Sequence, residues 1–438
     1  MAKFPKHKFI IKGGRVIDPL QDVDEVTDIL IENSKIKGMG NFDKTDGEIL
    51  DAKELVVAPG FIDMHTHLRE PGREDEETIG TGTKAAAKGG FTGVAAMANT
   101  EPVIDNSGMV RFVRETALRD GYVEVFPIGA VTKGQRGVEL VEMHDMVKAG
   151  CYGFSDDGNP IGNSLIMRSA LEYSQIVDKV VIVHEEDKEL TLDGQINEDF
   201  ISTKLGFQGM PSIAESIMVA RDAAILDFVG GKLHIAHLST RESLEIVKQA
   251  KKRGLNISCE VTPHHISLNS ACLVTFDSNL KMNPPLRTKE DTEALKIGLK
   301  EGLIDCIVTD HAPHAFFEKE MEFGNAPFGI IGLETALGIV CTELIESGIL
   351  SLAELVEKMS INPAKILGLG ERTLKEGSDA NITVFDPNKK WTVDVKKFVS
   401  KSSNSPYDGW KLKGQAVMTI VKGKIVYREG EFQKLASL

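Results

Sequence analysis

The stretch GFIDMHTHLREPG, residues 60–72, places two histidines one residue apart at the end of a short apolar run. Residues i and i+2 of a β-strand face the same side, so His65 and His67 are expected to direct their imidazoles towards one point, with Arg69 at the next position of that spacing. Converging imidazoles suit a divalent metal ion. A histidine-rich surface loop would have the same local sequence, so the motif needs partners elsewhere in the chain.

Further polar residues follow apolar, strand-like runs along the middle of the chain: Asn99, Asp157, His184, His237 and Asp310. One histidine in such a position is usually hydrogen-bonded to the backbone, and one aspartate usually caps a helix. Four histidines and two aspartates buried together would be costly, because the carboxylates repel one another and the imidazoles lack partners. A cation resolves both problems, so the six residues together predict a metal site.

The elements that must position these residues alternate along the chain. Candidate strands lie at residues 60–65, 92–99, 123–130, 151–157, 179–186, 232–239, 256–263 and 305–312. Amphipathic helical stretches separate them, for example 163–178, 212–229, 240–254 and 292–302. The alternation predicts an α/β fold, and eight strands favour a (β/α)8 TIM-type barrel over an open doubly wound sheet. Functional residues of such barrels lie at the carboxyl ends of the strands, where the polar residues above fall.

Both ends of the chain have the composition of β-structure. Residues 8–19, 28–40, 380–387 and 416–432 contain clustered or alternating β-branched residues around glycine turns. We expect residues 1–58 and 371–438 to form a small, composite β-rich domain. Residues 59–370 would then form the barrel.

Composition excludes several classes of partner. The net charge of −14 argues against nucleic acid, which calls for clustered Lys and Arg. No apolar run approaches the ~20 residues of a membrane span, and the N-terminus lacks the apolar core of a secretory signal. The five cysteines are scattered and form no CxxC pair, as is typical of reduced thiols. We therefore expect a cytoplasmic protein without a membrane or nucleic-acid partner.

Imidazole and carboxylate ligands without a thiolate suit zinc or another borderline divalent ion. Six ligands exceed the three that one catalytic zinc usually takes, so two zinc ions per subunit are expected, about 3.5–4 Å apart and bridged by an anionic side chain and a hydroxide. The expected ligands are His65, His67 and Asp310 for one ion, and His184 and His237 for the other. Asp157 is the candidate bridge, and the adjacent Asp156 is its competitor.

Other histidines of the barrel are expected outside this ligand set. His234 lies three positions before His237 on the same strand and is expected on the opposite face. His311 directly follows a proposed ligand and is expected to face away. His264 and His265 are expected near the mouth of the barrel as supporting residues.

These residues and several further motifs resemble one family. PGFIDMHTHLREPG resembles the metal-binding signature of the amidohydrolase superfamily, and in particular that of class I dihydroorotase. MANTEPVIDN, GFSDDG, VTPHH, KMNPPLR, TDHAPH and APFGIIGLETAL resemble the further motifs of that class. They run from residue 59 to about 340, and the β-rich termini match the small composite domain of the family.

The resemblance implies reversible hydrolysis of the ring amide of dihydroorotate to N-carbamoyl-aspartate, with ring closure as the direction used in pyrimidine synthesis. The ligands named above agree with those of the family. Many superfamily members bridge the metals with a carboxylated lysine. Here the end of the fourth strand offers SDDG, and Lys148 lies too far upstream, so the aspartate bridge at Asp157 is the matching pattern. Asp310 would act as general base and then as general acid.

The resemblance also implies the substrate contacts, which are His67, Arg69, Asn99, Asn283, His314 and the backbone of Phe328 and Gly329. Arg69, Asn99 and His314 would hold the free carboxylate, for which an arginine fork is suited. Asn283 and the two backbone positions would bind the amide and urea edges. Ala98 stands where family members usually have proline, a departure that removes no chemical group.

Three points stay open. The charged segment 315–328 is either a lid over the substrate or a plain surface loop. The function is also open to two alternatives: another cyclic amidase (hydantoinase, dihydropyrimidinase or allantoinase), or an inactive subunit that scaffolds aspartate carbamoyltransferase. Those amidases usually carry the lysine bridge, and an inactive subunit should have lost ligands that this chain keeps. For an active enzyme, a homodimer and an association with aspartate carbamoyltransferase remain open beside the small-molecule substrate.

Overall fold

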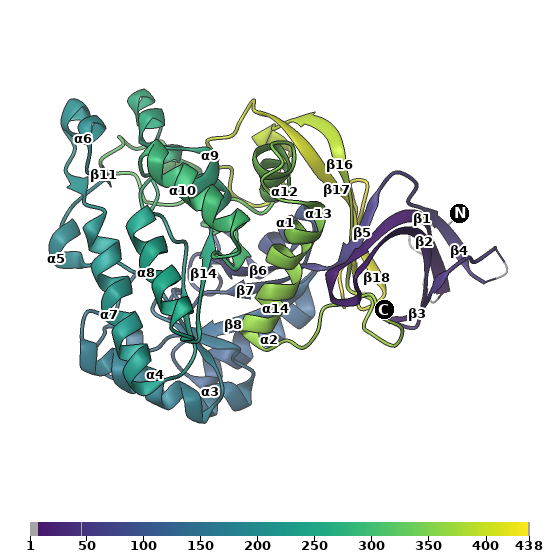
Figure 1. Ribbon diagram of the computed structural model, residues 1–438, viewed down its shortest axis with the longest axis horizontal. Coiled ribbons are helices and arrows are strands. Elements are labelled where there is room, and N and C mark those ends of the chain that lie inside the picture. Colours follow the sequence, from purple (N-terminus) through teal and green to yellow (C-terminus); the bar gives the residue numbers. More distant parts are fainter. Residues whose placement is uncertain (1–7, 45, 437–438) are drawn as a thin grey trace.

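Eight parallel strands follow one another along the chain and curve into a barrel (Figure 1). Their bounds are β6 Phe61–Thr66, β7 Phe91–Ala96, β8 Glu124–Gly129, β9 Gly153–Ser155, β10 Val180–Val183, β13 Leu233–Ile235, β14 Ile257–Val261 and β15 Cys306–Ile307. Each pairs with its neighbour in chain order from β6 to β15. The first and last strands meet beyond β15, where the N–H of His67 donates to the carbonyl oxygen of His311 at 2.8 Å. The predicted eight-stranded TIM-type barrel is confirmed.

This computed structural model describes residues 8–44 and 46–436. Residues 1–7 and 437–438, which the predicted small domain includes, lie outside the described part of the chain, as does residue 45. Within the described part, no helix is both long enough and apolar enough to cross a membrane.

Helices cross over between the strands and cover the outside of the barrel. The main ones are α1 Ile79–Gly89, α2 Ser107–Asp120, α3 Met143–Ala149, α4 Ser164–Ile176, α7 Ile213–Val229, α8 Arg241–Lys252, α10 Lys289–Lys300, α12 Ala336–Val340 and α14 Asn362–Leu367. Several begin at a threonine: the side chains of Thr78, Thr240 and Thr288 accept a backbone N–H in the first turn of α1, α8 and α10. Such caps satisfy donors that the helix itself leaves free.

Apolar side chains pack together at the inner side of the barrel strands. Ile62, Ala95, Ile128, Ile182 and Val308 belong to one buried cluster there. Alternate residues of the same strands pack outward against the helices in a second cluster. This two-sided burial explains why the strands appear in the sequence as short, nearly continuous apolar runs.

Strands from both ends of the chain form a second sheet beside the barrel, where Figure 1 shows the purple N-terminal strands next to the yellow C-terminal strands. Its nine strands are β1 Lys8–Asp18, β2 Val23–Glu32, β3 Lys35–Gly40, β4 Glu48–Asp51, β5 Val56–Pro59, β16 Ile382–Thr392, β17 Lys411–Val421, β18 Lys424–Arg428 and β19 Glu431–Phe432. The N-terminal strand β5 pairs with the C-terminal strand β16, which joins the two halves. The domain boundaries near residues 58 and 371 stay a prediction.

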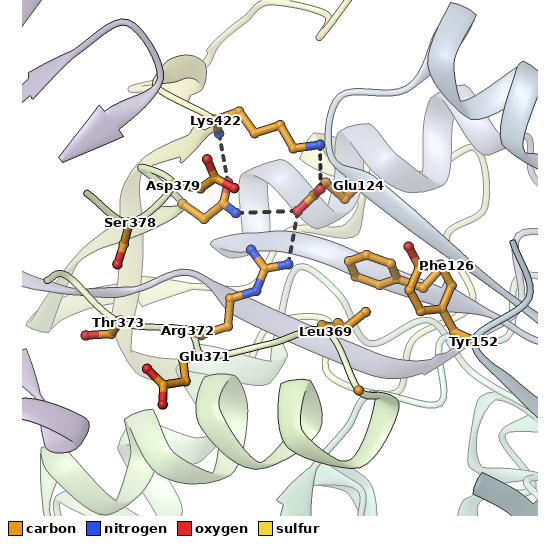
Figure 2. A pocket seen from close by; sticks show the side chains of 12 residues that line it. Glu124, Phe126, Tyr152, Leu369, Glu371, Arg372, Thr373, Ser378, Asp379 and Lys422 are labelled. Atoms are coloured by element: carbon orange, nitrogen blue, oxygen red, sulfur yellow. Dashed lines mark hydrogen bonds and ion pairs between the residues drawn. The ribbon is translucent and has the colours of Figure 1, made fainter. Parts of the chain in front are cut away.

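Glu124 of β8 connects the barrel to this sheet (Figure 2). Its carboxylate lies 2.8 Å from Lys422 Nζ, 3.1 Å from Arg372 Nη2 and 3.5 Å from Asn381 Nδ2. These partners line a cavity of about 360 Å³ together with Phe126. One carboxylate thus contacts the turn between β17 and β18 and two residues of the connection that leads into β16, which joins the barrel to the second sheet.

Candidate metal centre

The six proposed metal ligands all lie at the carboxyl ends of barrel strands. His65 is in β6 and His67 follows its end, Asp157 follows β9, and His184 follows β10 directly. His237 comes two residues after β13, and Asp310 three residues after β15. All six are buried. The barrel therefore brings together residues that are up to 245 positions apart (65 to 310) in the sequence.

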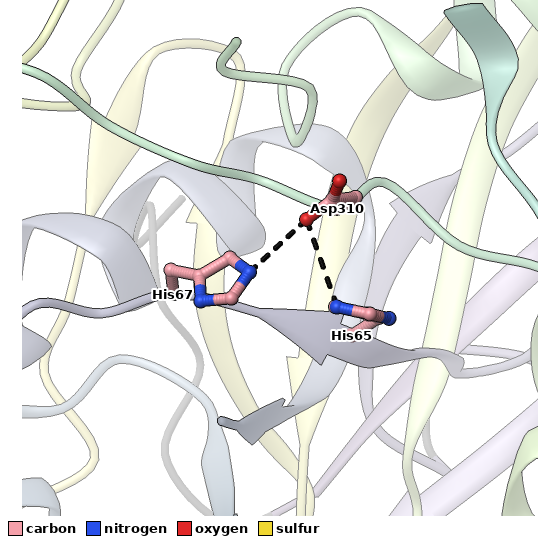
Figure 3. A group of neighbouring side chains, drawn as sticks. All are labelled: His65, His67 and Asp310. Atoms are coloured by element: carbon pink, nitrogen blue, oxygen red, sulfur yellow. Dashed lines mark hydrogen bonds and ion pairs between the residues drawn. The ribbon is translucent and has the colours of Figure 1, made fainter. Parts of the chain in front are cut away.

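His65, His67 and Asp310 form one group (Figure 3). Asp310 Oδ1 lies 3.1 Å from His67 Nε2 and 3.6 Å from His65 Nε2. The figure shows both imidazoles directed at the same carboxylate oxygen. This is the set that the sequence assigns to one ion.

Asp157 lies among all four histidines. Its Oδ1 is 3.5 Å from His65 Nε2, 3.4 Å from His237 Nε2 and 3.7 Å from His184 Nδ1. Its Oδ2 is 3.4 Å from His67 Nε2. One carboxylate oxygen thus faces His65, His184 and His237 and the other faces His67, so Asp157 contacts histidines proposed for both ions.

The donor atoms of this centre fit a cation. His65 Nε2 and Asp157 Oδ1 are buried and have no hydrogen-bond partner, although buried polar atoms are almost always satisfied. Burial alone would raise the pKa of Asp157, but the charge of His65 and the neighbouring imidazoles of His237 and His67 hold it well below its usual range. The site therefore favours the ionised form of the Asp157 carboxylate and positive charge beside it.

Three residues orient the imidazoles from behind. His65 Nδ1 lies 2.6 Å from Glu260 Oε1, His67 Nδ1 lies 2.8 Å from Asn99 Oδ1, and His184 Nε2 lies 3.1 Å from Glu186 Oε2. Partners of this kind fix the ring and leave the other nitrogen free for a metal. In this structure Asn99, expected at the substrate carboxylate, contacts His67.

Glu260 and Glu186 were not found by sequence reasoning. Glu260 lies inside β14, fully buried, and also accepts from His234 Nε2 at 3.0 Å. Burial would raise its pKa, but the charge of His65 and the hydrogen bonds from His234 and His65 lower it to about 2. The available signal was a charged residue within an apolar strand. His234 stays outside the ligand set, but it supports the centre through Glu260.

The two adjacent aspartates of the SDDG motif have different surroundings. Asp156 accepts the N–H of Val131 at 2.8 Å, the N–H of Thr132 at 3.1 Å and the hydroxyl of Thr132. Burial raises its pKa to about 6. Asp156 therefore anchors the loop after β8, while Asp157 points to the histidines.

The remaining histidines near the mouth have other partners. His311 accepts the N–H of Gly332 at Nδ1 and lies 3.4 Å from Glu77 through Nε2. His265 contacts Thr262 and the carbonyl oxygen of Pro284. His264 Nε2 is buried without a partner. The contacts of His311 and His265 leave both outside the ligand set, and His264 belongs to none of the groups of described residues that could hold a metal ion.

The backbone is unusual at three residues of the mouth. Arg69, His237 and Asp310 have positive φ values of 60°, 29° and 48°. Residues other than glycine rarely adopt this conformation, and such strain concentrates at functional sites. Other turns of the chain contain this conformation too, and at the mouth it fixes the backbone of three proposed site residues.

Arg69 and His314 lie together at the rim of the centre. Arg69 Nη2 is 3.4 Å from His314 Nε2, and Arg69 Nε is 2.9 Å from Glu76 Oε2. His314 Nδ1 lies 3.1 Å from the other oxygen of Glu76. Glu76 is buried and, like Glu260, was missed in the sequence. It holds two of the three residues expected to bind a carboxylate.

The remaining expected substrate contacts are engaged within the protein. Asn283 Nδ2 donates to Glu186 Oε2 at 3.0 Å. His314 Nε2 lies 2.7 Å from the carbonyl oxygen of Phe328, and the N–H of Gly329 donates to the carbonyl oxygen of Lys281 at 2.9 Å. Their roles towards a substrate stay predictions.

Known proteins resemble this chain over nearly its whole length. A sequence model described as Dihydro-orotase-like matches residues 54–243, and one described as Amidohydrolase family matches residues 229–427. A dihydroorotase of Geobacter metallireducens is 51% identical over 421 residues, 96% of this chain and 99% of the relative. One of Syntrophus aciditrophicus is 48% identical over 426 residues, 96% of this chain and 100% of the relative. The chain belongs to the dihydroorotase family.

Solved structures show the same architecture for this dihydroorotase family member. An L-hydantoinase (dihydropyrimidinase) from Arthrobacter aurescens superposes with a TM-score of 0.87 at 26% identity and covers 98% of both chains. A dihydropyrimidinase from Brevibacillus agri superposes with a TM-score of 0.84 at 24% identity and covers 97% of this chain and 96% of that one. The superfamily of this fold is metal-dependent, in agreement with the histidine and aspartate groups found here.

Two buried lysines hold the segment 315–328 of this protein against the loop that contains Ser278 and Lys281. Lys281 Nζ donates to the carbonyl oxygens of Phe323 and Gly324, each at 3.0 Å. Lys319 Nζ donates to the carbonyl oxygens of Ser278 and Pro327 at 3.1 and 2.7 Å. Within the segment, α11 Phe316–Lys319 exposes two phenylalanines. Whether it acts as a lid stays a prediction.

Proposed function

We propose that this protein is a zinc-dependent dihydroorotase, which interconverts dihydroorotate and N-carbamoyl-aspartate and closes the ring in pyrimidine biosynthesis. One observation carries the proposal: the six-residue cluster at the carboxyl ends of the strands, in a chain that is 51% identical to a dihydroorotase over nearly its full length. The buried Glu260 and Glu186 support the same function, because each contacts the second ring nitrogen of a proposed histidine ligand and thereby orients its imidazole.

We propose two zinc ions per subunit. The ligands of one would be His65, His67 and Asp310, those of the other His184 and His237, and Asp157 would bridge them. Imidazole and carboxylate donors without a thiolate support zinc, and the distances from Asp157 to all four imidazoles support a bridge. When bound, such a pair of ions supplies a nucleophile from water at neutral pH and polarises the scissile carbonyl.

Asp310 is proposed as the proton carrier. Hydrolysis adds the hydroxyl of water to the carbonyl carbon of the ring amide and a proton to the leaving ring nitrogen. A carboxylate at the centre can accept the proton of the attacking water and deliver it to that nitrogen. In ring closure the same carboxylate takes the proton from the carbamoyl nitrogen. Its distance of 3.1 Å from His67 Nε2 supports a place for this carboxylate within the proposed centre.

The proposed substrate clamp consists of Arg69, Asn99 and His314 at the free carboxylate. His67, Asn283 and the backbone of Phe328 and Gly329 would contact the rest of the ring. Arg69 is half-buried and pairs with the buried Glu76, so its guanidinium is already held in one orientation. A preorganised arginine fork binds a planar carboxylate at two points and thereby selects which ring carbonyl faces the centre.

Replacing Arg69 by Ala is expected to raise the Michaelis constant for dihydroorotate and for N-carbamoyl-aspartate by about 10- to 100-fold, because a charge-assisted contact is worth roughly 1.5–3 kcal/mol. Steady-state kinetics in both directions measure the effect. Arg73→Ala is the matched control, since Arg73 also contacts Glu76 but is more exposed. Unchanged Michaelis constants in Arg69→Ala would show that the carboxylate lies elsewhere.

Metal content measured on protein assayed for dihydroorotate hydrolysis tests the proposal most directly. We expect close to two zinc ions per chain, loss of turnover after chelation, and recovery when zinc is returned. Hydantoin, dihydrouracil and allantoin are assayed in parallel. Faster turnover of any of these than of dihydroorotate would assign the protein to another class of cyclic amidase.

The proposed partners and location are tested separately. We propose a cytoplasmic protein that works on small molecules and forms a homodimer. An association with aspartate carbamoyltransferase is a further proposal. Light scattering of the purified protein tests the first association, and co-elution of the two enzymes tests the second.

A further inference from the structure

A connection of the small sheet reaches across to the mouth of the barrel. Residues 400–405 lie between β16 and β17 in the chain, and the yellow connection in Figure 1 runs from these strands towards the barrel. Four residues of this segment are buried although they are polar: Ser400, Ser402, Asn404 and Ser405. Buried polar side chains are costly unless they are paired, so their partners show what the segment does.

Asn404 uses its side chain to join two loops of the mouth. Its Oδ1 accepts the N–H of His314 at 3.2 Å. Its Nδ2 donates to the carbonyl oxygens of Ala312 at 3.0 Å and Gly329 at 3.2 Å. The carbonyl oxygen of Asn404 also accepts the N–H of Ile331 at 3.0 Å. One buried amide therefore ties the loop after β15 to the residues that follow the segment 315–328.

These bonds fix His314 against Gly329. A Cβ on Gly329 would lie 3.3 Å from His314 Nε2 and 2.7 Å from the Cβ of Ala312, so the backbone of residue 329 packs directly beneath the imidazole. The same ring nitrogen lies 2.7 Å from the carbonyl oxygen of Phe328. The position of His314 relative to Phe328 and Gly329 thus depends on the contacts that Asn404 makes to both sides.

The neighbouring Ser402 extends this support to the other half of the clamp. Its hydroxyl lies 2.8 Å from the carbonyl oxygen of His314 and 2.7 Å from that of Glu76. Glu76 in turn holds Arg69. Residues 400–405 therefore contact both sides of the proposed carboxylate clamp from a part of the chain that carries none of its members.

We infer that Asn404 is a positioning residue for substrate binding: through its side-chain amide the connection of the small sheet sets His314 for the substrate carboxylate and Gly329 for the rest of the ring. The inference rests on the proposed function. It predicts that Asn404 acts on the Michaelis constant more than on turnover, because it touches the clamp and none of the six proposed metal ligands.

Asn404→Asp is the sharpest test, because it keeps the shape and the acceptor for His314 but turns a carboxylate oxygen towards the two carbonyl oxygens. We expect the Michaelis constant for dihydroorotate to rise about tenfold, with turnover and zinc content near those of the wild type. Asn404→Ser, which is too short to reach all three partners, is expected to change the Michaelis constant in the same direction. Asn388→Asp, an exposed position between the halves of β16, is the matched control and should behave as the wild type.

The Michaelis constant is independent of the folded fraction, so partial unfolding of a variant does not imitate the expected result. Values within twofold of the wild type in both Asn404 variants, with only thermal stability lowered, would reduce Asn404 to a structural role and overturn the inference. The proposed function stands in that case. If wild type and Asn388→Asp both fail to hydrolyse dihydroorotate with zinc present, the proposed function fails and this inference with it.

Discussion

Asp310→Asn is expected to lower turnover of dihydroorotate by on the order of 10²–10⁴-fold while the zinc content stays near that of the wild type. The carboxamide keeps an oxygen at the position 3.1 Å from His67 Nε2 and 3.6 Å from His65 Nε2. It cannot accept and release a proton as a carboxylate does. Chemistry should therefore fail while ligand binding is largely preserved.

Turnover, Michaelis constant and zinc content of the same preparation measure this effect. Asp305→Asn is the matched control, because Asp305 lies just before β15, where it bonds Lys251 Nζ at 2.6 Å and the N–H of Cys259 at 2.8 Å. That variant should lose stability and keep turnover. Near wild-type turnover in Asp310→Asn would remove the proton-carrier role.

Asp157→Asn is expected to lose zinc. Removing a residue that only orients a metal ligand costs roughly 10–100-fold in activity, and we expect turnover to fall by more than that here. Asp157 faces four imidazoles, and its Oδ1 is buried without any hydrogen-bond donor. A neutral amide cannot balance two cations there, and its N–H₂ group would face ring nitrogens that are needed as ligands.

Asp156→Asn provides the contrast on the adjacent residue. Its carboxylate accepts from Val131 and Thr132 only, so we expect zinc and turnover to be retained. The free energy of unfolding should fall by about 1–3 kcal/mol, as when a buried hydrogen-bond partner is lost. Zinc binding and denaturant unfolding of both variants separate the two roles. The opposite result, with zinc lost in Asp156→Asn alone, would exchange the assignments.

The sequence by itself determined the barrel and the ligand candidates. A parallel strand buried on both faces requires a short apolar run, and eight such runs with crossovers are compatible with few folds. Parallel strands also bring their carboxyl ends to one face of a barrel. His65, His184 and Asp310 could therefore be gathered from their positions after apolar runs, before any contact between them was known.

The tertiary structure decided between Asp156 and Asp157. Consecutive residues of an extended chain point to different sides, and apart from the motif register of the family two identical side chains give no indication of which one faces inward. Only the location of Val131 and Thr132, which occupy one of the two carboxylates, assigns the other to the histidines.

The supporting residues were also decided by tertiary structure. Glu260 is 195 residues from His65, and Asn404 is 90 residues from His314. The local sequence shows that the side chains of Glu260 and Asn404 are polar. Whether each is buried, and which residue it contacts, is decided only when distant segments of the chain pack together. Metal ligands are recognisable because their type and strand position are restricted by their chemistry. A residue that holds a ligand can be any hydrogen-bonding side chain that the fold brings within about 3 Å, because hydrogen bonding constrains distance and direction and leaves sequence position free.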